Sequence, residues 1–339
     1  MEASRENERE SKRGLTLETV KKVLSEYLII LVLAFMAVTL AALNPNFLTL
    51  NNIMNLLTQT AIFGILALGI FIVLVSKGID LSLGSTLAFA GIIAGTISQT
   101  TYAVDQIFPN IGMAPLGVTI LVTLVIGGIV GGINGGLIAY TKIPPFIATL
   151  GTQIAFRGAA LMVTMGRPVS NINPQMHWFG SRIAGYIPVP VLIYIAVIAL
   201  VGILMKYTSF GKSVYAIGGN VEAAEISGIR VNRNIVWVYT ISGILASVAA
   251  LIFIGRTGGS IQPAAGLMFE TTAIAAATIG GTSHSGGVGK VWGVVVGALI
   301  LGTLTNGFTL LGIDAFVQQI IMGMIIVGAV VIDMQKNKK

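Results

Sequence analysis

Residues 116–140 read LGVTILVTLVIGGIVGGINGGLIAY, and this stretch decides the fold class of the chain. It holds no charged residue, and its apolar residues run on without regular alternation with polar ones. An α-helix needs roughly 20 apolar residues to cross the hydrocarbon core of a bilayer, whereas a membrane β-strand needs only about 9–11. The stretch is therefore too long for a barrel strand and predicts a transmembrane helix.

The whole chain has the same character. Of its 339 residues, 55% are hydrophobic and 10% are charged, and the mean hydropathy is +0.89. Soluble domains carry about 25% charged residues, so a soluble protein is excluded. Long apolar runs lie at residues 27–43, 53–75, 81–98, 116–140, 146–165, 188–206, 235–255, 266–282, 291–311 and 316–332. These runs predict an all-α, polytopic integral membrane protein with about ten transmembrane helices.

The net charge of +7 is explained by membrane topology and not by nucleic-acid binding. If the N-terminus lies in the cytoplasm, the basic residues that fall on the outer side are Arg167, Arg182 and Arg256. Cytoplasmic loops of membrane proteins carry an excess of Lys and Arg. We therefore predict an even number of spans, with both termini cytoplasmic.

The charge pattern also divides the chain. Residues 1–26 form a charged cytoplasmic tail, residues 27–333 a single transmembrane domain, and residues 334–339 a second cytoplasmic tail. The first tail lacks the apolar core of a signal peptide, so we expect it to stay attached. Residues 207–234 make the longest cytoplasmic connection, which has room for a short helix of its own.

Sites that depend on cysteine, clustered histidine or a phosphate loop are not supported. The chain has no Cys and two His residues, so we expect no disulfide, thiolate metal site, iron–sulfur cluster or cofactor. Residues 280–290 are glycine-rich, but His284 stands where a phosphate loop needs Gly, and Val291 stands where it needs Ser or Thr. We therefore predict no ATP binding by that motif and no catalytic residue.

Glycines recur at four-residue spacing inside two predicted spans. They are Gly127, Gly128, Gly131, Gly132, Gly135 and Gly136 in the fourth span and Gly289, Gly293 and Gly297 in the ninth. Such spacing lets helix backbones approach closely in lipid, and sliding of glycine-lined helices is a second interpretation. Asn134 and Asn306 lie among glycines in the fourth and ninth spans, which run in opposite directions. This similarity between the two spans suggests an inverted repeat of spans two to five with spans seven to ten.

Polar groups at membrane depth are hypotheses for function. Arg157 in the fifth span and Glu270 near the start of the eighth could pair, either to fix helix packing or to act at a transport path. Asp80 and Ser82 precede the third helix. They could cap its free backbone N–H groups, or they could mark a broken helix whose polar end faces a substrate.

Four motifs, in matching order, resemble those of one transporter family. They are GIDLSLGS at residues 78–85, FIATL at 146–150, YAIGGNVEAAEISGIRV at 215–231 and GGTSHSGGVG at 280–289. As a set they resemble the permease subunits of the ribose, galactose and xylose class of bacterial ABC importers, and the resemblance covers about residues 44–333. It implies a permease that pairs with a second copy of itself, with a cytoplasmic ATPase subunit carrying two nucleotide-binding modules, and with a periplasmic sugar-binding protein.

The same resemblance implies that the loop at residues 207–234 couples to the ATPase. The coupling residues by similarity are Asn220, Glu222, Ala223, Ala224, Ser227 and Gly228. Local chemistry agrees, because Asn220 can cap a helix start and Gly228 is placed to end about two turns. Ala223 and Ala224 would permit close approach to the partner. Without the resemblance, an ordinary cytoplasmic linker explains these residues.

For the sugar path, the candidates are polar residues of the spans that could offer transient hydrogen bonds. They are Asp80, Ser82, Ser85, Asn134, Thr152, Gln153 and Asn306. Arg157 matches a basic residue in the fifth span of family members, which adds weight to its pairing with Glu270. Several members open the eighth span with Tyr-Glu-Leu-Asp, whereas this chain has Thr272 in place of that last acid. No role is therefore transferred to Thr272.

We therefore predict the permease subunit of an ATP-driven, binding-protein-dependent sugar importer that works by alternating access. Ribose is the first candidate among pentoses, hexoses and polyols. The alternative is an ion-coupled secondary sugar transporter, which should need a titratable or cation-binding cluster, and the spans offer little beyond Arg157 and Glu270. An intramembrane enzyme would need paired acids holding a metal, or a nucleophile with a base, and no residues are spaced for either.

Overall fold

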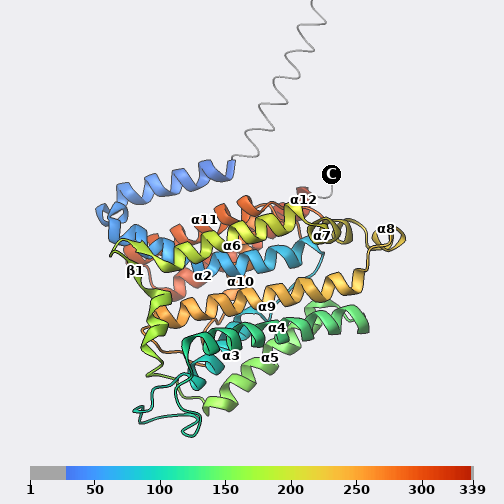
Figure 1. The fold of residues 1–339 in the computed structure, drawn as a ribbon. Helices are drawn as coiled ribbons and strands as arrows, with labels where there is room; N and C mark the ends of the chain where they lie inside the picture. The colour runs from blue at the N-terminus through green and yellow to red at the C-terminus, as the bar shows by residue number, and fades with distance from the viewer. Residues whose placement is uncertain (1–27, 337–339) are drawn as a thin grey trace, which may run out of the picture.

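The computed structural model of the chain describes residues 28–336. It is a helical bundle whose long helices lie side by side, with the short β1–β2 pair at one end and α8 at the other (Figure 1). The elements are the helix Leu28–Leu43, η1 (Pro45–Leu48), α2 (Leu50–Val75), α3 (Leu83–Ile97), α4 (Leu116–Thr141), α5 (Pro145–Thr164), η2 (Pro174–Gly180), β1 (Arg182–Ile183), β2 (Ile187–Pro188), α6 (Val189–Tyr207), α7 (Ser209–Gly219), α8 (Val221–Ile226), α9 (Val231–Arg256), α10 (Phe269–Ile279), α11 (Val291–Leu310) and α12 (Ala315–Lys336).

Each of the ten apolar runs contains one helix, and the predicted polytopic membrane protein is confirmed. Within the described residues, six helices are long and apolar enough to cross a bilayer: α2, α4, α5, α6, α9 and α11. The first helix, α3, α10 and the apolar part of α12 are shorter. At a rise of 1.5 Å per residue, the 15 residues of α3 and the 11 of α10 reach about 22 and 16 Å, less than the hydrocarbon thickness of about 30 Å.

The predicted spans 81–98 and 266–282 are thus helical over only part of their length. Non-helical segments precede both helices, at residues 76–82 and 257–268. Left-handed backbone at Gly266 (φ 68°) and Met268 (φ 64°) interrupts any helix just before α10. An apolar run indicates that a segment lies away from water, but it does not indicate the backbone conformation. The run alone therefore could not locate the non-helical segments before α3 and α10.

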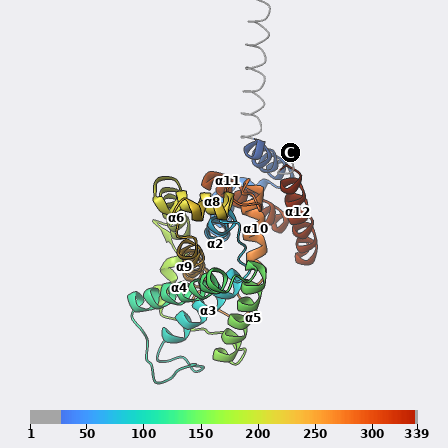
Figure 2. The same cartoon turned by 90° about the vertical axis from the view of Figure 1, so that its right-hand side faces the viewer.

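Helices α2 and α9 form the centre of the bundle. The apolar window of α2 is 83% buried and that of α9 is 61% buried, against 28% for α4 and 22% for α5. Helix α2 packs against α6, α9, α10 and α11, and α9 packs against α2, α3 and α4. Figure 2, which looks along the long helices, shows this arrangement. The outer helices keep apolar side chains exposed, as a lipid-facing surface requires.

One glycine series of α4 packs directly on the backbone of α9. A Cβ atom added to Gly127 would overlap the carbonyl oxygen of Gly243, and one added to Gly131 would overlap that of Tyr239. Gly136, by contrast, faces open space. The close packing predicted from the four-residue spacing is therefore confirmed for Gly127 and Gly131, because only residues without a side chain allow two helix backbones to approach this closely.

The helix contacts fall into two matching sets. Helix α3 packs against α4, α5 and α9, and α10 packs against α11, α12 and α2. Helix α4 packs on α9, and α11 packs on α2. Exchanging α2–α5 with α9–α12 therefore maps one set of contacts onto the other.

Candidate functional site

The short helices α3 and α10 begin next to each other inside the bundle. A Cβ atom added to Gly84, in the first turn of α3, would overlap both the carbonyl oxygen of Gly266 and Oε2 of Glu270. Glu270 lies in the first turn of α10 and is 4% exposed. Its carboxylate therefore lies at two helix N-termini, where free backbone N–H groups favour negative charge. We call this place the half-helix junction.

Asp80, which is buried, orders the segment before α3. Its Oδ1 accepts hydrogen bonds from the backbone N (2.9 Å) and from Oγ (2.6 Å) of Ser82. Its Oδ2 accepts one from Oγ of Ser242 in α9, at 3.1 Å. Ser82 makes no side-chain cap bond to α3, because its hydroxyl donates to the carboxylate. Of the two predicted capping residues, Asp80 therefore shapes the turn into the helix, and Ser82 does not cap it.

The hydrogen bonds continue from Ser82 into α4 and α5. Nδ2 of Asn134 donates to Oγ of Ser82 at 2.7 Å, and Oγ1 of Thr152 donates to Oδ1 of Asn134 at 2.6 Å. Oγ of Ser85 donates to the carbonyl oxygen of Ser82 at 2.8 Å. These buried side chains, together with Asp80, satisfy one another and join α3, α4, α5 and α9. Their predicted place along a sugar path stays a prediction.

Arg157 and Glu270 lie at the same junction but have different hydrogen-bond partners. Nη1 of Arg157 donates to the carbonyl oxygens of Pro263 and Ala265, in the segment that leads into α10. Oε1 of Glu270 accepts from Nε2 of Gln153 at 3.1 Å. Helix α5 therefore holds the start of α10 through two side chains. A direct ion pair between Arg157 and Glu270 stays a prediction.

Asn306, the remaining path candidate, lies apart from this network. Its side-chain amide and that of Asn52 exchange two hydrogen bonds, of 2.8 and 3.0 Å, which join α11 to α2. Asn134 and Asn306, similar in sequence setting, thus have different partners.

The part of the chain at residues 28–336 offers no metal centre. Within it, no three His, Asp or Glu side chains lie close enough to hold a metal ion. Nε2 of His284 and Oγ1 of Thr278 in α10 form a hydrogen bond of 2.8 Å.

The second candidate site is α8, which protrudes from one end of the bundle (Figure 1). Oδ1 of Asn220 accepts a hydrogen bond from the backbone N of Ala223 at 2.9 Å, which caps the helix start. Gly228 has φ +81°, and its N–H donates to the carbonyl oxygen of Glu225 while that of Ile229 donates to Ala224. This pair of bonds is typical of a glycine-ended helix. The predicted short helix, with its start and its end, is confirmed.

The two alanines of α8 lie on different faces of the helix. Ala224 is buried against Ile217 and Val231 of the same chain, and the predicted close approach of a partner at these residues stays a prediction. Ala223 is exposed. Ile226, which sequence reasoning missed, is 89% exposed. The signal that could have found it is a large apolar residue beside the acidic Glu225 at the end of a short helix of the cytoplasmic connection.

Helix α7 joins α8 to the end of α2 and to the loop at residues 280–290. A Cβ atom added to Gly218 would overlap the carbonyl oxygen of Val75, the last residue of α2. The hydroxyl of Tyr215 donates to the carbonyl oxygen of Gly289 at 2.8 Å, and burial raises the pKa of this hydroxyl, which keeps it protonated as a donor. Gly287 N also donates to Val75 O, at 2.9 Å. Helix α7 therefore contacts the end of α2, directly before the segment at residues 76–82 that leads into α3, and the loop at residues 280–290 that leads out of α10.

The structure is an apolar helical membrane bundle with two short helices that begin inside it, a feature that occurs in membrane transporters. Residues 52–330 match the family described as branched-chain amino acid transport system / permease component. The chain belongs to this family, and it is therefore a transport permease component and not an enzyme.

Curated relatives narrow the class. The chain is 42% identical to the ribose import permease protein of Bacillus subtilis, over 90% of this chain and 91% of that protein. It is 38% identical to the galactose/methyl galactoside import permease protein of Haemophilus influenzae, over 94% and 96%. It is 37% identical to the ribose import permease protein of Escherichia coli, again over 94% and 96%. No solved structure matches the chain. The resemblance to sugar-importer permeases is confirmed.

Proposed function

We propose that the chain is the membrane-spanning permease subunit of an ATP-driven, binding-protein-dependent ribose importer. The observation that carries this proposal is the set of contacts made by α7 and α8. An exposed, capped helix is anchored through α7 to the end of α2, just before the segment that leads into α3, and to the loop that follows α10. Two of the three relatives above are named for ribose import and one for galactose import, which supports ribose first and galactose second.

In this proposal the end of the bundle that carries α8 faces the cytoplasm. Lys142, whose Nζ donates to Oδ1 of Asn232, lies at this end, as do Arg230 and Arg233 beside the end of α8. Such clustering of basic residues supports a cytoplasmic side. Helices α3 and α10 each cross the membrane together with the non-helical segment that precedes them. Ten crossings then place both termini on the cytoplasmic side.

The contacts of α7 suggest how ATP drives the transport cycle. The ATPase subunit holds α8 and moves it when its nucleotide-binding modules close. Two contacts of α7 pass this motion on. The packing of Gly218 on Val75 moves the end of α2, next to the segment that leads into α3. The hydrogen bond from Tyr215 to Gly289 moves the loop that follows α10. The hydrogen bonds from Asp80 to Thr152 keep α3, α4, α5 and α9 together as one body. That body moves against a second copy of the chain, and the sugar passes between the two copies.

The matching helix contacts support an inverted repeat of α2–α5 with α9–α12. Both halves contain a short helix in the equivalent place, α3 and α10, and these two helices begin at the half-helix junction. In transporters built from inverted repeats, broken helices meet near the bilayer midplane. The junction is then the place where the two halves of one permease are held in register.

The proposal is tested by uptake into proteoliposomes that hold the permease with the ATPase subunit and the binding protein encoded with it. Radiolabelled ribose should accumulate when ATP is supplied, and unlabelled galactose at equal concentration should compete poorly. Accumulation should persist with an uncoupler. Uptake by the permease alone that follows a proton or sodium gradient would reject the proposal and favour the ion-coupled transporter.

Ile226 provides a variant that separates coupling from folding. Because its side chain is 89% exposed, Ile226→Glu should leave the melting temperature of the isolated permease unchanged. It should nevertheless reduce both capture of the ATPase subunit and ATP-driven uptake, whereas Ile226→Val should retain both. Normal ATPase capture by Ile226→Glu would show that α8 is not the docking element.

A further inference from the structure

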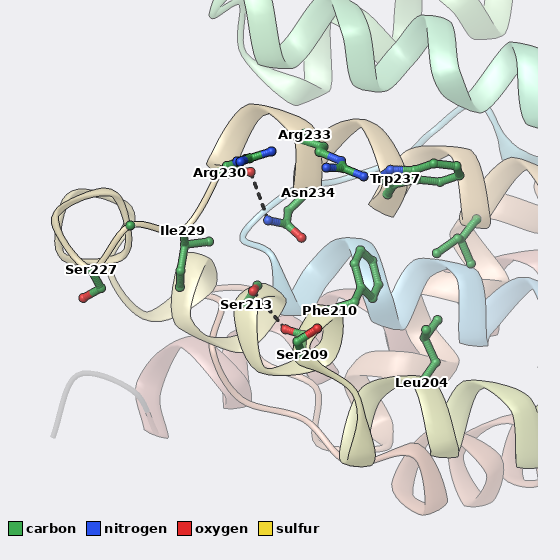
Figure 3. A pocket seen from close by; sticks show the side chains of 12 residues that line it. Leu204, Ser209, Phe210, Ser213, Ser227, Ile229, Arg230, Arg233, Asn234 and Trp237 are labelled. Carbon is green, nitrogen blue, oxygen red and sulfur yellow. Dashed lines mark hydrogen bonds between the residues drawn. The ribbon is translucent and has the colours of Figure 1, made fainter.

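A pocket of about 640 Å³ lies beside the coupling segment, between α7, the start of α9 and the end of α6. Figure 3 shows Arg230, Arg233 and Trp237 along the wall formed by α9, with Phe210 and Ser213 of α7 facing them. The pocket does not belong to the half-helix junction, but two of the predicted coupling residues, Ser227 and Gly228, form part of its wall.

Two arginines give the pocket a positive wall without a bound countercharge. Arg230 and Arg233 are exposed and lie three residues apart, on one side of the first turn of α9. Within the described part of the chain, neither arginine forms an ion pair with a carboxylate. Glu225 lines a smaller neighbouring hollow together with both arginines. Guanidinium groups bind phosphate oxygens in a bidentate fashion and are the preferred side chains for this task.

The rest of the pocket wall changes from polar to apolar along α9. Ser227 and Arg230 lie near α8, whereas Trp237, Ile241 and Leu204 lie further along the apolar helices α9 and α6. Trp237 is 49% exposed, and partly exposed tryptophans are enriched at the level of lipid headgroups. A free sugar or inorganic phosphate has no apolar chain that could contact Trp237, Ile241 and Leu204. A phospholipid can place the upper part of its acyl chains against them.

We propose that this pocket binds the headgroup of an anionic phospholipid, with the phosphate on Arg230 and Arg233 and the acyl chains against Trp237 and Leu204. Basic pockets between membrane helices on the cytoplasmic side bind such headgroups. The bound lipid would touch Ser213 of α7, the segment after α8 and the start of α9. It would therefore brace the coupling segment against α9 and link the activity of the permease to the lipid composition of its membrane.

The test measures lipid binding to the delipidated permease in detergent, by titration with phosphatidylglycerol and with phosphatidylcholine of the same acyl chains. Each arginine near a membrane surface contributes enough for roughly a fivefold change in affinity. We therefore expect Arg230→Gln/Arg233→Gln to weaken phosphatidylglycerol binding about 30-fold and to leave phosphatidylcholine binding unchanged. Lys212→Gln is the matched control, because Lys212 is an exposed base of α7 that does not line the pocket.

A second measurement keeps both arginines and so does not depend on the folding of the double variant. In Trp178→Phe/Trp292→Phe, Trp237 is the remaining tryptophan of the chain. Phosphatidylglycerol with brominated acyl chains should quench its fluorescence at a lower mole fraction than brominated phosphatidylcholine.

Three outcomes would overturn the proposal. Equal quenching by the two lipids would show that the site does not select anionic lipid. An equal loss of binding in Lys212→Gln would show that only general surface charge matters. Competition by millimolar inorganic phosphate, together with no effect of Trp237→Ala on lipid binding, would assign the pocket to a free anion.

Discussion

Gly218 lies where α7 contacts the end of α2, and we expect Gly218→Ala to break this contact. A Cβ atom at this position would overlap the carbonyl oxygen of Val75 and would lie 2.5 Å from the backbone N of Gly287. Both neighbours are backbone atoms, which cannot rotate away as a flexible side chain can. Forcing an extra methyl group into a packed site costs about 1–3 kcal/mol of unfolding free energy.

Gly219→Ala is the matched control, because nothing lies within 4 Å of a Cβ atom added there. Alanine favours a helix over glycine by about 0.5–1 kcal/mol at either position, so the difference between the two variants isolates the steric cost. At about 2 °C per kcal/mol for a chain of this size, Gly218→Ala should melt about 2–6 °C below Gly219→Ala in a thermal-shift assay in detergent.

The same pair of variants tests the transmission of movement from α8. In proteoliposomes that hold the full importer, Gly218→Ala should lower ATP-driven uptake while the ATPase subunit stays bound, and Gly219→Ala should behave as the unmodified chain does. Equal melting temperatures together with equal uptake in the two variants would refute the anchoring of α7 on α2.

Three further outcomes are expected. Asn220→Ala removes the N-cap of α8 and should cost about 0.5–2 kcal/mol locally, seen as faster amide hydrogen exchange in α8 with no change in α9. Tyr215→Phe removes the hydrogen bond to Gly289, worth about 0.5–1.5 kcal/mol, and should lower uptake without releasing the ATPase; full uptake would show that this contact does not carry movement. Gly131→Ala should lower the melting temperature because its Cβ overlaps α9, whereas Gly136→Ala, in open space, should not; equal melting of the two would contradict the close packing of α4 on α9.

The features that could be predicted are those that depend on neighbouring residues. Each apolar run contains a helix, because a segment in lipid must be apolar and must satisfy its own backbone hydrogen bonds. The ends of α8 could be predicted because Asn220 and Gly228 form hydrogen bonds with backbone groups only a few residues away. Such local capping can be recognised in the sequence itself.

The candidate site was only partly predictable. Asp80, Asn134 and Thr152 were singled out because polar groups are rare in the spans, but their mutual hydrogen bonds arise from the packing of separate helices. The breaks before α3 and α10 were hidden, because apolar composition does not encode backbone conformation. Ala224 faces inward and Ile226 outward, and a helix as short as α8 shows no period from which this could be predicted.

The amino-acid sequence by itself determined which segments leave water and where one short helix begins and ends, since both follow from local composition and local hydrogen bonding. Only the tertiary structure decided which polar groups meet at the half-helix junction, which glycines contact another backbone, and that two arginines share a pocket with Trp237. Each of these depends on residues far apart in the chain, which packing alone brings together.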